Sequence, residues 1–428
     1  MMDSGIKWVG DVHKKYSIRK LKYGCEILDE FRKPVTAHLR SQDSEILYDY
    51  YGASGAIDKI DGYTIDDDIL LIGEDGANLR VRNLPLVYQV HGKAWINNHA
   101  HIVKPIKGIL DYTYTYFMLE SLDINPYITG SAQPKFNQES LRNMHIIIPP
   151  IDEQKRIANF LDEKCEQIDS LTADIQSQID TLEEYKKSVI TEAVTKGLNP
   201  DVEMKDSEIE WIGQIPSNWN ILKIKNIITK DSFGIKIGPF GSALTNKTKG
   251  DGEYNVYGQA NLISNDFSKT KHTVSKDVFT SLMAYEVFPN DICLSMMGTI
   301  GKCKTVPQNI TQGIMDSHLI KIRLSPIVLS KFFEYAYDKD LGGICFTQMQ
   351  YDKKGFIMDG LNTTIVKNLK LPVPPIQEQK EILHYLDAKC AEIDAIISEK
   401  KEQLSTLAEY KKSLIYEYVT GKKEVAAA

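Results

Sequence analysis

The sequence of 428 residues lacks the marks of several common protein classes. It has six cysteines but no C-x-x-C pair and no Cys/His cluster, which argues against a disulfide scaffold and a zinc site. No stretch of 18 residues is apolar and uncharged, and the first twenty residues have no apolar core behind their charges. We therefore expect reduced thiols, no membrane span, no signal peptide and a cytoplasmic location.

An excess of positive charge is also missing. The net charge is −7, which at first argues against a nucleic-acid partner. The lysines are unevenly spread, however, and residues 221–276 contain nine lysines against four acidic residues. A basic surface is expected in that part of the chain. With 42% hydrophobic residues, a chain of this length is expected to form two or three domains.

Motifs of a catalytic centre are scarce. Asn125-Pro126-Tyr127 is similar to the N-P-P-Y loop with which amino-methyltransferases hold a flipped adenine, but the second proline and a Gly-rich cofactor turn are missing. Residues 296–303 lack the first glycine and the Ser/Thr of a phosphate loop. Residues 72–82 carry one Glu-Asp pair without the lysine of a nuclease site. We expect turns at these places and predict neither a catalytic residue nor a metal site.

One segment of the chain occurs twice. IPPIDEQKRIANFLDEKC at residues 148–165 returns as VPPIQEQKEILHYLDAKC at residues 373–390. Aligned without gaps at an offset of 225, positions 149–195 and 374–420 are identical at 25 of 47 places. This match indicates an internal duplication.

Each copy predicts one long helix. A Pro-Pro pair is followed by about 45 residues without proline or glycine, up to Gly197 and Gly421. At 1.5 Å per residue such helices span roughly 65 Å. Within each copy, apolar residues recur in two rows with a spacing of seven, the pattern of a coiled-coil seam. The predicted seam consists of Leu161, Cys165, Ile168, Ile175, Ile179, Leu182, Val189, Leu386, Cys390, Ile393, Ile397, Leu404, Leu407 and Leu414.

Three positions of the predicted seam allow two interpretations each. Cys165 and Cys390 occupy the same place in the two copies, where a small buried hydrophobe fits and a redox pair is the alternative. Lys400 interrupts the second seam, either to fix the register or as a solvated side chain leaning off the seam. Two apolar stripes of matching length are expected to pack on each other, but the heptads do not fix whether the helices run parallel or antiparallel.

A weaker sequence match extends the repeat to the whole chain. DSGIKWVG at residues 3–10 matches DSEIEWIG at residues 206–213 in Asp, Ser, Ile, Trp and Gly. Each unit thus has a leading segment, a variable block, a Pro-Pro junction and a long helix. Short apolar runs between Gly, Asn and Asp turns dominate both blocks, which predicts two similar α+β domains. The predicted bounds are 1–148 and 201–373 for these domains and 149–200 and 374–425 for the long helices.

Residues 236–272 have a composition that is typical of nucleic-acid contact. Lysines alternate there with four aromatic residues, amides and glycines. The lysines could neutralise phosphates, and Gln259 or Asn261 could pair with adenine. An ordinary solvated loop is the alternative.

Together these features resemble the specificity subunit of type I restriction-modification systems. The resemblance rests on P-P-x-x-E-Q at both junctions, EYKKS at 184–188 and 409–413, the I-x-W-x-G leading segments, GPFGS at 238–242 and LIGEDGANL at 71–79. It covers essentially the whole chain. GPFGS has no counterpart in the first block, and the blocks differ otherwise, which in this family implies two different half-sites.

The resemblance implies a non-catalytic subunit whose two target recognition domains each read half of a split target in double-stranded DNA. A pair of antiparallel coiled-coil helices would separate the domains in a tandem repeat with pseudo-two-fold symmetry. The implied partners are two methyltransferase subunits, which bring S-adenosylmethionine, and restriction subunits, which use ATP and Mg; this chain would bind no cofactor itself. At about 3.4 Å per base pair, the helices would limit the unread spacer to under two turns of DNA.

The resemblance and the basic segment together single out candidate residues. Glu153, Gln154, Glu378 and Gln379 would serve junction geometry and partner contacts, with capping of the helix N-terminus as the alternative. The predicted DNA-binding residues are Tyr51, Ser54, Asn78, Arg80, Arg82, Lys236, Phe240, Ser242, Lys247, Lys249, Tyr257, Gln259, Asn261, Lys269 and Lys271.

Two other functions stay open on the sequence. A protein-interaction scaffold without DNA readout would have the same architecture, and a stand-alone DNA-modifying enzyme would act through the loop at Asn125.

Overall fold

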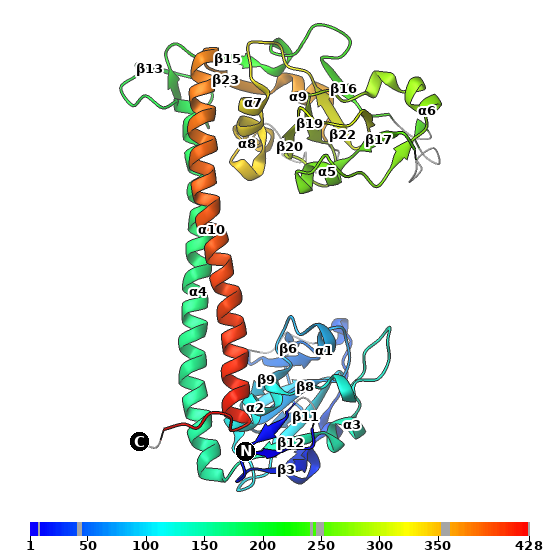
Figure 1. Cartoon of the computed structure of the whole chain (residues 1–428), viewed down its shortest axis with the longest axis vertical. Coiled ribbons are helices and arrows are strands. Elements are labelled where there is room, and N and C mark those ends of the chain that lie inside the picture. Colours follow the sequence, from blue (N-terminus) through cyan, green and yellow to red (C-terminus); the bar gives the residue numbers. More distant parts are fainter. Residues whose placement is uncertain (7–8, 41–44, 240–242, 245–251, 352–359, 427–428) are drawn as a thin grey trace. The chain divides into compact units, whose positions relative to one another are not determined.

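The protein is described by a computed structural model that covers residues 1–6, 9–40, 45–239, 243–244, 252–351 and 360–426. Its residues group into two compact units, 1–176 with 402–428 and 177–401. Each unit holds a globular domain and parts of two long helices, α4 (Ile151–Lys196) and α10 (Ile376–Val419) (Figure 1). None of the helices in the described part of the chain combines the length and the apolar character that a membrane crossing needs.

Two four-stranded sheets form the domain of the first unit, in the orders β4-β11-β8-β9 and β6-β5-β10-β7. The second sheet contains one parallel pair, β5 with β10, and its other pairs are antiparallel. The strands are β4 (Cys25–Ile27), β5 (Tyr48–Gly52), β6 (Gly55–Ile60), β7 (Ile65–Asp66), β8 (Ile69–Gly73), β9 (Val87–Val90), β10 (Lys93–Ile96) and β11 (Ala100–Pro105). The two-stranded ribbons β1 (Met2–Asp3) with β2 (Asp11–Val12) and β3 (Ser17–Lys20) with β12 (His145–Ile148) complete the domain.

The domain of the second unit repeats this plan. Its sheets have the orders β16-β22-β19-β20 and β18-β17-β21, again with one parallel pair, β17 with β21. Ribbons of β13 with β14 and β15 with β23 take the places of the ribbons in the first unit. The strands are β13 (Met204–Asp206), β14 (Gln214–Pro216), β15 (Asn220–Lys223), β16 (Ile235–Ile237), β17 (Tyr254–Tyr257), β18 (Thr273–Val274), β19 (Ile292–Ser295), β20 (Cys303–Thr305), β21 (Gly313–Met315), β22 (Leu319–Ile322) and β23 (Lys370–Val373).

Short helices pack against these sheets. The helices of the first unit are α1 (Asn78–Val81), α2 (Tyr112–Ser121) and α3 (Gln138–Asn143). Those of the second unit are α5 (Gln259–Ser264), α6 (Lys276–Ser281), α7 (Ser330–Tyr337), α8 (Ile344–Tyr351) and α9 (Thr363–Asn368). The predicted α+β fold, repeated in tandem, is confirmed.

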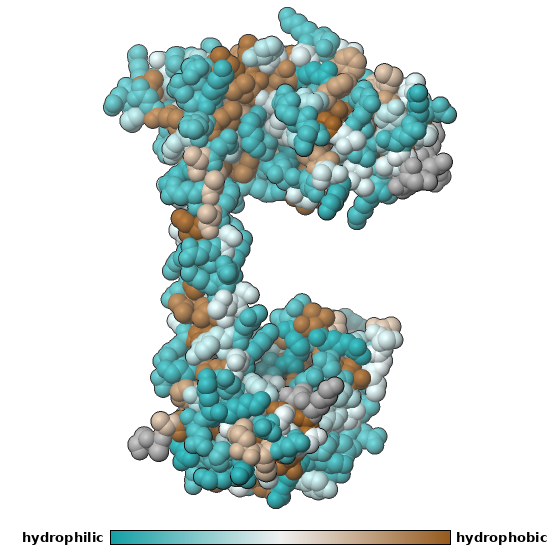
Figure 2. Space-filling view, viewed as in Figure 1, coloured by the Kyte–Doolittle hydropathy of each residue, from teal (hydrophilic) through white to brown (hydrophobic). Residues whose placement is uncertain are grey.

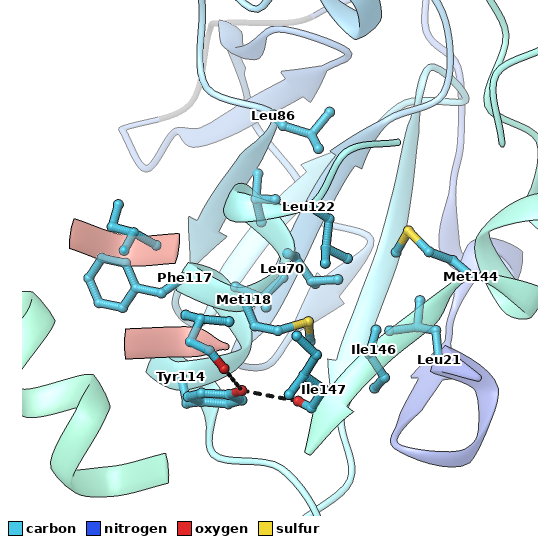
Figure 3. Packing of buried hydrophobic residues seen from close by; sticks show 14 of the residues in the cluster. Leu21, Leu70, Leu86, Tyr114, Phe117, Met118, Leu122, Met144, Ile146 and Ile147 are labelled. Carbon is cyan, nitrogen blue, oxygen red and sulfur yellow. Dashed lines mark hydrogen bonds between the residues drawn. The ribbon is translucent and has the colours of Figure 1, made fainter. Parts of the chain in front are cut away.

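The core of the first unit joins its domain to the long helices. Figure 3 shows Tyr114 and Phe117 of α2 beside segments of α10, with Ile146 and Ile147 of β12 close by. The Tyr114 hydroxyl donates to the carbonyl oxygens of Ile147, at 3.0 Å, and of Val419, at 3.4 Å. Because the hydroxyl of a buried tyrosine needs a hydrogen-bond partner, the bond to Val419 holds the end of α10 against the domain.

Within each unit the two long helices run antiparallel. In the first unit, Lys411 forms an ion pair with Asp169 at 2.6 Å, and in the second unit Lys186 pairs with Asp394 at 2.6 Å. These four residues correspond to one another at the repeat offset of 225, so the same bond occurs once in each unit. Lys400 donates to Gln178 at 2.5 Å, which places this interruption of the seam at the helix surface.

Burial along the helices follows the predicted heptad rows. Eleven of the fourteen predicted seam residues are buried, each with at most 9% of its surface exposed. The other three, Leu182, Leu404 and Leu407, are half-buried. All six cysteines are free and buried. Burial raises the pKa of Cys165 to about 11 and also raises that of Cys390, so both remain thiols at neutral pH and pack as small hydrophobes.

Candidate nucleic-acid interface

Two predicted DNA-binding residues lie at the hairpin of β5 and β6. Ser54 is exposed in the turn between these strands. Tyr51 is half-buried, pairs with Ile96 of β10 and packs against the neighbouring core. Burial, followed by the charge of Asp49, raises the pKa of Tyr51, so the phenol stays neutral. The hairpin therefore presents Ser54 outward on a firmly packed base.

The next three predicted residues lie in or directly after α1. Asn78 accepts a hydrogen bond from the backbone N–H of Leu84 at 2.9 Å and donates to two carbonyl oxygens of the same loop. Arg82 has a left-handed φ of 53° and donates to the carbonyl oxygens of Glu120 and Leu122 at the end of α2. These two side chains hold the loop. Arg80 is exposed and, among the described residues, donates to the carbonyl oxygen of Gly130 alone, so its guanidinium keeps donors for a ligand.

A buried ionic cluster fixes the start of that loop, and no sequence motif pointed to it. His101 is fully buried, with Nδ1 at 2.7 Å from Asp29 Oδ2 and Nε2 at 2.7 Å from the carbonyl oxygen of Phe136. Since a carbonyl oxygen only accepts, Nε2 donates to Phe136, and Nδ1 faces the carboxylate of Asp29. Arg32 links this pair to Glu74, the first residue after β8, at 2.5 Å.

The pKa values of the two carboxylates in the cluster are both lowered. Burial alone would raise the pKa of Asp29, but hydrogen bonds from His101 and the backbone of Ile102, with the charge of Arg32, lower it below the ordinary value. The pKa of Glu74 is likewise lowered, because Arg32 and Lys135 outweigh its burial. Both carboxylates are thus ionised at neutral pH and orient the loop that carries Arg80.

In the second unit, two predicted contacts belong to the core. Tyr257 is fully buried, and its hydroxyl donates to the carbonyl oxygen of Thr311 at 2.6 Å. Asn261 is 5% exposed; it accepts from the Gly258 N–H and donates to the carbonyl oxygens of Asp266 and Lys269, each near 2.8–3.0 Å. Their polar groups are used by the fold, so neither is retained as a DNA contact.

Other predicted residues of this unit are accessible. Lys269 and Lys271 are exposed in the segment between α5 and β18. Lys236 on β16 is half-buried, with its ammonium over the rings of Phe233 and Tyr285 at 5.9 and 5.5 Å. Gln259, at the start of α5, donates to Ser295 Oγ at 2.9 Å and to the carbonyl oxygen of Met297. Phe240, Ser242, Lys247 and Lys249 lie outside the described residues.

The base of this surface is also ionic. Lys321 of β22 is fully buried; its ammonium lies 3.7 Å from Asp291 and donates to the carbonyl oxygen of Glu286. The Arg323 guanidinium donates to both carboxylate oxygens of Asp291, at 2.8 and 3.0 Å. Burial lowers the pKa of Lys321, and the charge of Asp291 opposes that shift. Each domain therefore contains a buried cluster of charged side chains, and the two clusters consist of different residues.

The junction glutamines occupy equivalent sites. Gln154 is fully buried, donates to the carbonyl oxygens of Ile109 and Pro149, and accepts from the Asp111 N–H, at 2.8–2.9 Å. Gln379 makes the same three bonds in the second unit, to Ile327, Pro374 and Leu329, at 2.8–2.9 Å. The oxygen and the nitrogen of both side-chain amides form hydrogen bonds within the junction, so neither amide is available to a partner subunit.

The junction glutamates are more accessible. Glu153 accepts a hydrogen bond from the Tyr16 hydroxyl at 2.8 Å, and Glu378 accepts one from Asn218 at 3.3 Å. Both are half-buried and connect the helix start to the residues directly before β3 or β15 of the same unit. A role in partner contact stays a prediction for these two carboxylates.

The loop considered for methyl transfer has a local structure of its own. Asn125 starts a single 3-10 turn, and its amide donates to Asp123 at 2.8 Å. This bond is typical of an exposed turn. In the part of the chain that the structure describes, no group of three or more His, Cys, Asp or Glu side chains is arranged to hold a metal ion.

Comparison with known proteins identifies the family. The model of the type I restriction modification DNA specificity domain matches residues 13–181 and again 216–406. A putative type I restriction enzyme specificity subunit of Haemophilus influenzae is 26% identical over 373 residues, covering 85% of this chain and 84% of its own. The putative type I restriction enzyme MjaX specificity subunit of Methanocaldococcus jannaschii is 26% identical over 443 residues, covering 97% of this chain and 96% of its own.

Solved structures agree on the fold. A chain from a study of complex assembly and conformational transition of the type I R-M system aligns with a TM-score of 0.68 at 13% identity, covering 96% of this chain and all of that one. The HsdS subunit from Thermoanaerobacter tengcongensis aligns with a TM-score of 0.50 at 14% identity, covering 99% of this chain and all of its own. With both family matches in tandem, this chain belongs to the type I restriction-modification DNA specificity family.

Proposed function

We propose that each globular domain binds one half of a split target in double-stranded DNA, and that the chain assembles methyltransferase and restriction subunits around that target. One observation carries the proposal: a single strand plan occurs twice and presents different outward segments. After β5 the first unit turns directly into β6, whereas after the equivalent β17 the second unit forms α5. Two unlike surfaces on one scaffold are suited to two unlike half-sites.

Accessible polar residues next to these segments are the proposed base and phosphate contacts. In the first unit these are Ser54 and Arg80, whose guanidinium can donate to guanine O6 and N7. In the second unit, Lys269 and Lys271 would meet phosphates. Because the amide nitrogen of Gln259 is already used, its Oε1 is the atom available to accept from adenine N6 or cytosine N4.

A map of methylated adenines tests this assignment of half-sites. The chain is co-expressed with its cognate methyltransferase subunit, and the methylated motif is read by single-molecule sequencing. Arg80→Ala should relax only one half of the motif and Gln259→Ala only the other, because a lost bidentate or single base contact costs about 1–3 kcal/mol of discrimination. Exposed Lys107→Ala is the control and should leave the motif intact. Relaxation of both halves by either variant would contradict the assignment.

Partner subunits would dock on the long helices. Six large apolar side chains are exposed there among the described residues, with 38–54% of their surface accessible, and four of them form equivalent pairs: Leu171, Tyr185, Ile376, Tyr385, Ile396 and Tyr410. At the offset of 225, Leu171 corresponds to Ile396 and Tyr185 to Tyr410, so the same exposed positions recur. Apolar residues also interrupt the polar surface along the helices in Figure 2. Exposed side chains of this kind favour association with another protein.

In the first unit, the ion pair of Lys411 and Asp169 brings Tyr410 of α10 to about the same level as Leu171 of α4. In the second unit, the pair of Lys186 and Asp394 does the same for Tyr185 and Ile396. Each unit would thus offer one matching position to one methyltransferase subunit. S-adenosylmethionine, ATP and Mg would be bound by the partners, not by this chain.

Co-purification measures the docking. Tyr185→Ala with Tyr410→Ala should abolish capture of the methyltransferase by the tagged chain, while the free energy of unfolding changes by less than about 0.5 kcal/mol because both rings are exposed. Single variants should retain one bound copy. Full capture by the double variant would refute these docking positions and leave the DNA assignment unaffected.

A further inference from the structure

The ribbons that connect each domain to its long helix carry a basic surface that the predicted DNA contacts do not include. In the first unit this surface, the first ribbon patch, consists of Lys20, Lys22, Arg142 and His145. In the second unit the equivalent surface, the second ribbon patch, consists of Lys223, Lys225, Lys367 and Lys370.

The two patches occupy the same places on the scaffold. Lys20 of β3 lies directly opposite His145 of β12, and Lys223 of β15 lies directly opposite Lys370 of β23. Arg142 lies in the last turn of α3 and Lys367 in the last turn of α9, at the repeat offset of 225. The register is tied by one more shared bond, since Leu21 N–H donates to Met144 and Ile224 N–H donates to Leu369, at 2.8 and 2.9 Å.

The patches are accessible. Lys20, Tyr23 and His145 line, with Ile18 and Arg19, one hollow of about 590 Å³ on the first unit. Arg142 and Lys225 are exposed, and the remaining basic side chains are half-buried. A ligand that reaches the hollow would meet the cationic side chains of Arg19 and Lys20 together.

The basic side chains of the patches have no ion-pair partner in the part of the chain that the structure describes. Across the described residues, none of these eight side chains forms an ion pair with a carboxylate; Lys20 donates to the neutral amide of Asn143 at 3.2 Å. Like charges directly opposite each other on two strands are destabilising, which applies to Lys223 and Lys370. Unpaired cations kept at matching places in both repeats indicate a polyanionic ligand.

We propose that both ribbon patches bind phosphates of the DNA duplex without reading sequence. The domains present different outward segments, but the patches are alike, so their ligand must be alike at both half-sites. The phosphate backbone is such a ligand. A chain with a net charge of −7 also has to meet DNA through local basic surfaces.

The position of the first patch indicates which phosphates it contacts. Within the domain of the first unit, β3, β12 and α3 lie at one end and β6 with α1 at the other (Figure 1). The patch would therefore contact phosphates that flank the bases read near Ser54 and Arg80. This inference rests on the proposed function, in which both domains bind the same duplex.

Salt-dependent binding tests the proposal. The complex of the full chain with its methyltransferase is titrated with a fluorescent 50-base-pair duplex at several NaCl concentrations. Two triple variants neutralise one patch each: Lys20→Gln, Lys22→Gln and Arg142→Gln, or Lys223→Gln, Lys225→Gln and Lys367→Gln. The control, Lys155→Gln, Lys380→Gln and Lys412→Gln, removes the same charge from exposed positions of α4 and α10 that form no ion pair with any described residue.

Each lost phosphate contact should lower the salt slope by about 0.9 and, at 0.1 M salt, reduce affinity on the order of eightfold. We expect both patch variants to bind target and scrambled duplexes more weakly by the same factor, with an unchanged methylation motif. The control should bind like the wild type.

The outcomes separate the inference from the proposed function. If the wild-type complex binds DNA without salt dependence, the proposed function itself fails. If it binds normally and the patch variants match the control, only the inference is overturned. If the patch variants lose the methyltransferase instead of DNA affinity, the patches bind an acidic surface on the partner, which also overturns it.

Discussion

Replacement of one buried junction glutamine should destabilise the second unit severely, whereas replacement of an exposed glutamine two residues away should not. The amide of Gln379 serves three backbone groups: the carbonyl oxygens of Ile327 and Pro374 and the N–H of Leu329. Gln379→Leu keeps most of the side-chain volume and removes all three hydrogen bonds. The matched control is Gln377→Leu in the same turn of α10, where the exposed Gln377 donates to Glu381 and to no other residue that the structure describes.

The magnitude follows from the cost of unsatisfied buried polar groups. Each such group costs about 1–3 kcal/mol, so three groups give about 3 kcal/mol at the lower limit. The exposed Gln377 should contribute less than about 0.5 kcal/mol. With a urea dependence of about 3 kcal/mol/M, the midpoint of unfolding should fall by about 1 M for Gln379→Leu and hardly move for Gln377→Leu.

Tryptophan fluorescence in urea is a suitable assay. Trp219 is fully buried in the same hydrophobic cluster as Val373 and Ile382, which flank the Gln379 junction. With the other three tryptophans, Trp8, Trp95 and Trp211, replaced by phenylalanine in every variant, the red shift of Trp219 reports loss of packing at this junction. Equal midpoints for the two leucine variants would refute the role assigned to the buried amide.

Three further predictions concern charge and thiols. Because the pKa values of Asp29 and Glu74 are lowered in the fold, their stabilisation is complete above the ordinary carboxyl pKa of about 4 and is lost as the pH falls through the lowered values. Circular dichroism during acid titration should show His101→Gln unfolding at higher pH than the wild type; an unchanged midpoint would contradict the cluster. Ellman's reagent should find no rapidly reacting thiol in the folded chain and six in denaturant, since all six cysteines are buried; fast modification of Cys165 or Cys390 would restore the redox alternative. Lys186→Ala with Lys411→Ala should cost less than about 1 kcal/mol per ion pair and nothing in 1 M NaCl, because Asp169 and Asp394 are mostly exposed; a larger loss that persists in salt would mean that these lysines pack in the seam.

Features that depend on local or periodic signals could be predicted from the sequence. The Pro-Pro junctions, the two long helices and the buried heptad rows follow from residue spacing, and the helices extend from Ile151 to Lys196 and from Ile376 to Val419. The antiparallel direction did not follow from the heptads. It came from the family resemblance, and the ion pairs of Lys186 and Lys411 with residues of the opposite helix confirm it within each unit.

Features that depend on long-range packing were missed or wrongly assigned. Tyr257 and Asn261 lie in a lysine-rich segment, yet both are buried. Tyr257 belongs to a strand, and the amide of Asn261 donates to backbone carbonyl oxygens of the loop that follows its helix. Composition cannot separate a polar side chain that faces solvent from one that satisfies backbone groups. His101 and Asp29 are 72 positions apart in the sequence, and no local sequence pattern predicts such a contact.

The central claim is that this chain alone sets a two-part DNA target. The most direct measurement is a genome-wide map of methylated adenines in cells that express the cognate methyltransferase subunit with and without this chain. We predict a motif of two unlike half-sites separated by an unread spacer of under two DNA turns, present only with the chain. A continuous motif, or a motif that persists without the chain, would contradict the account.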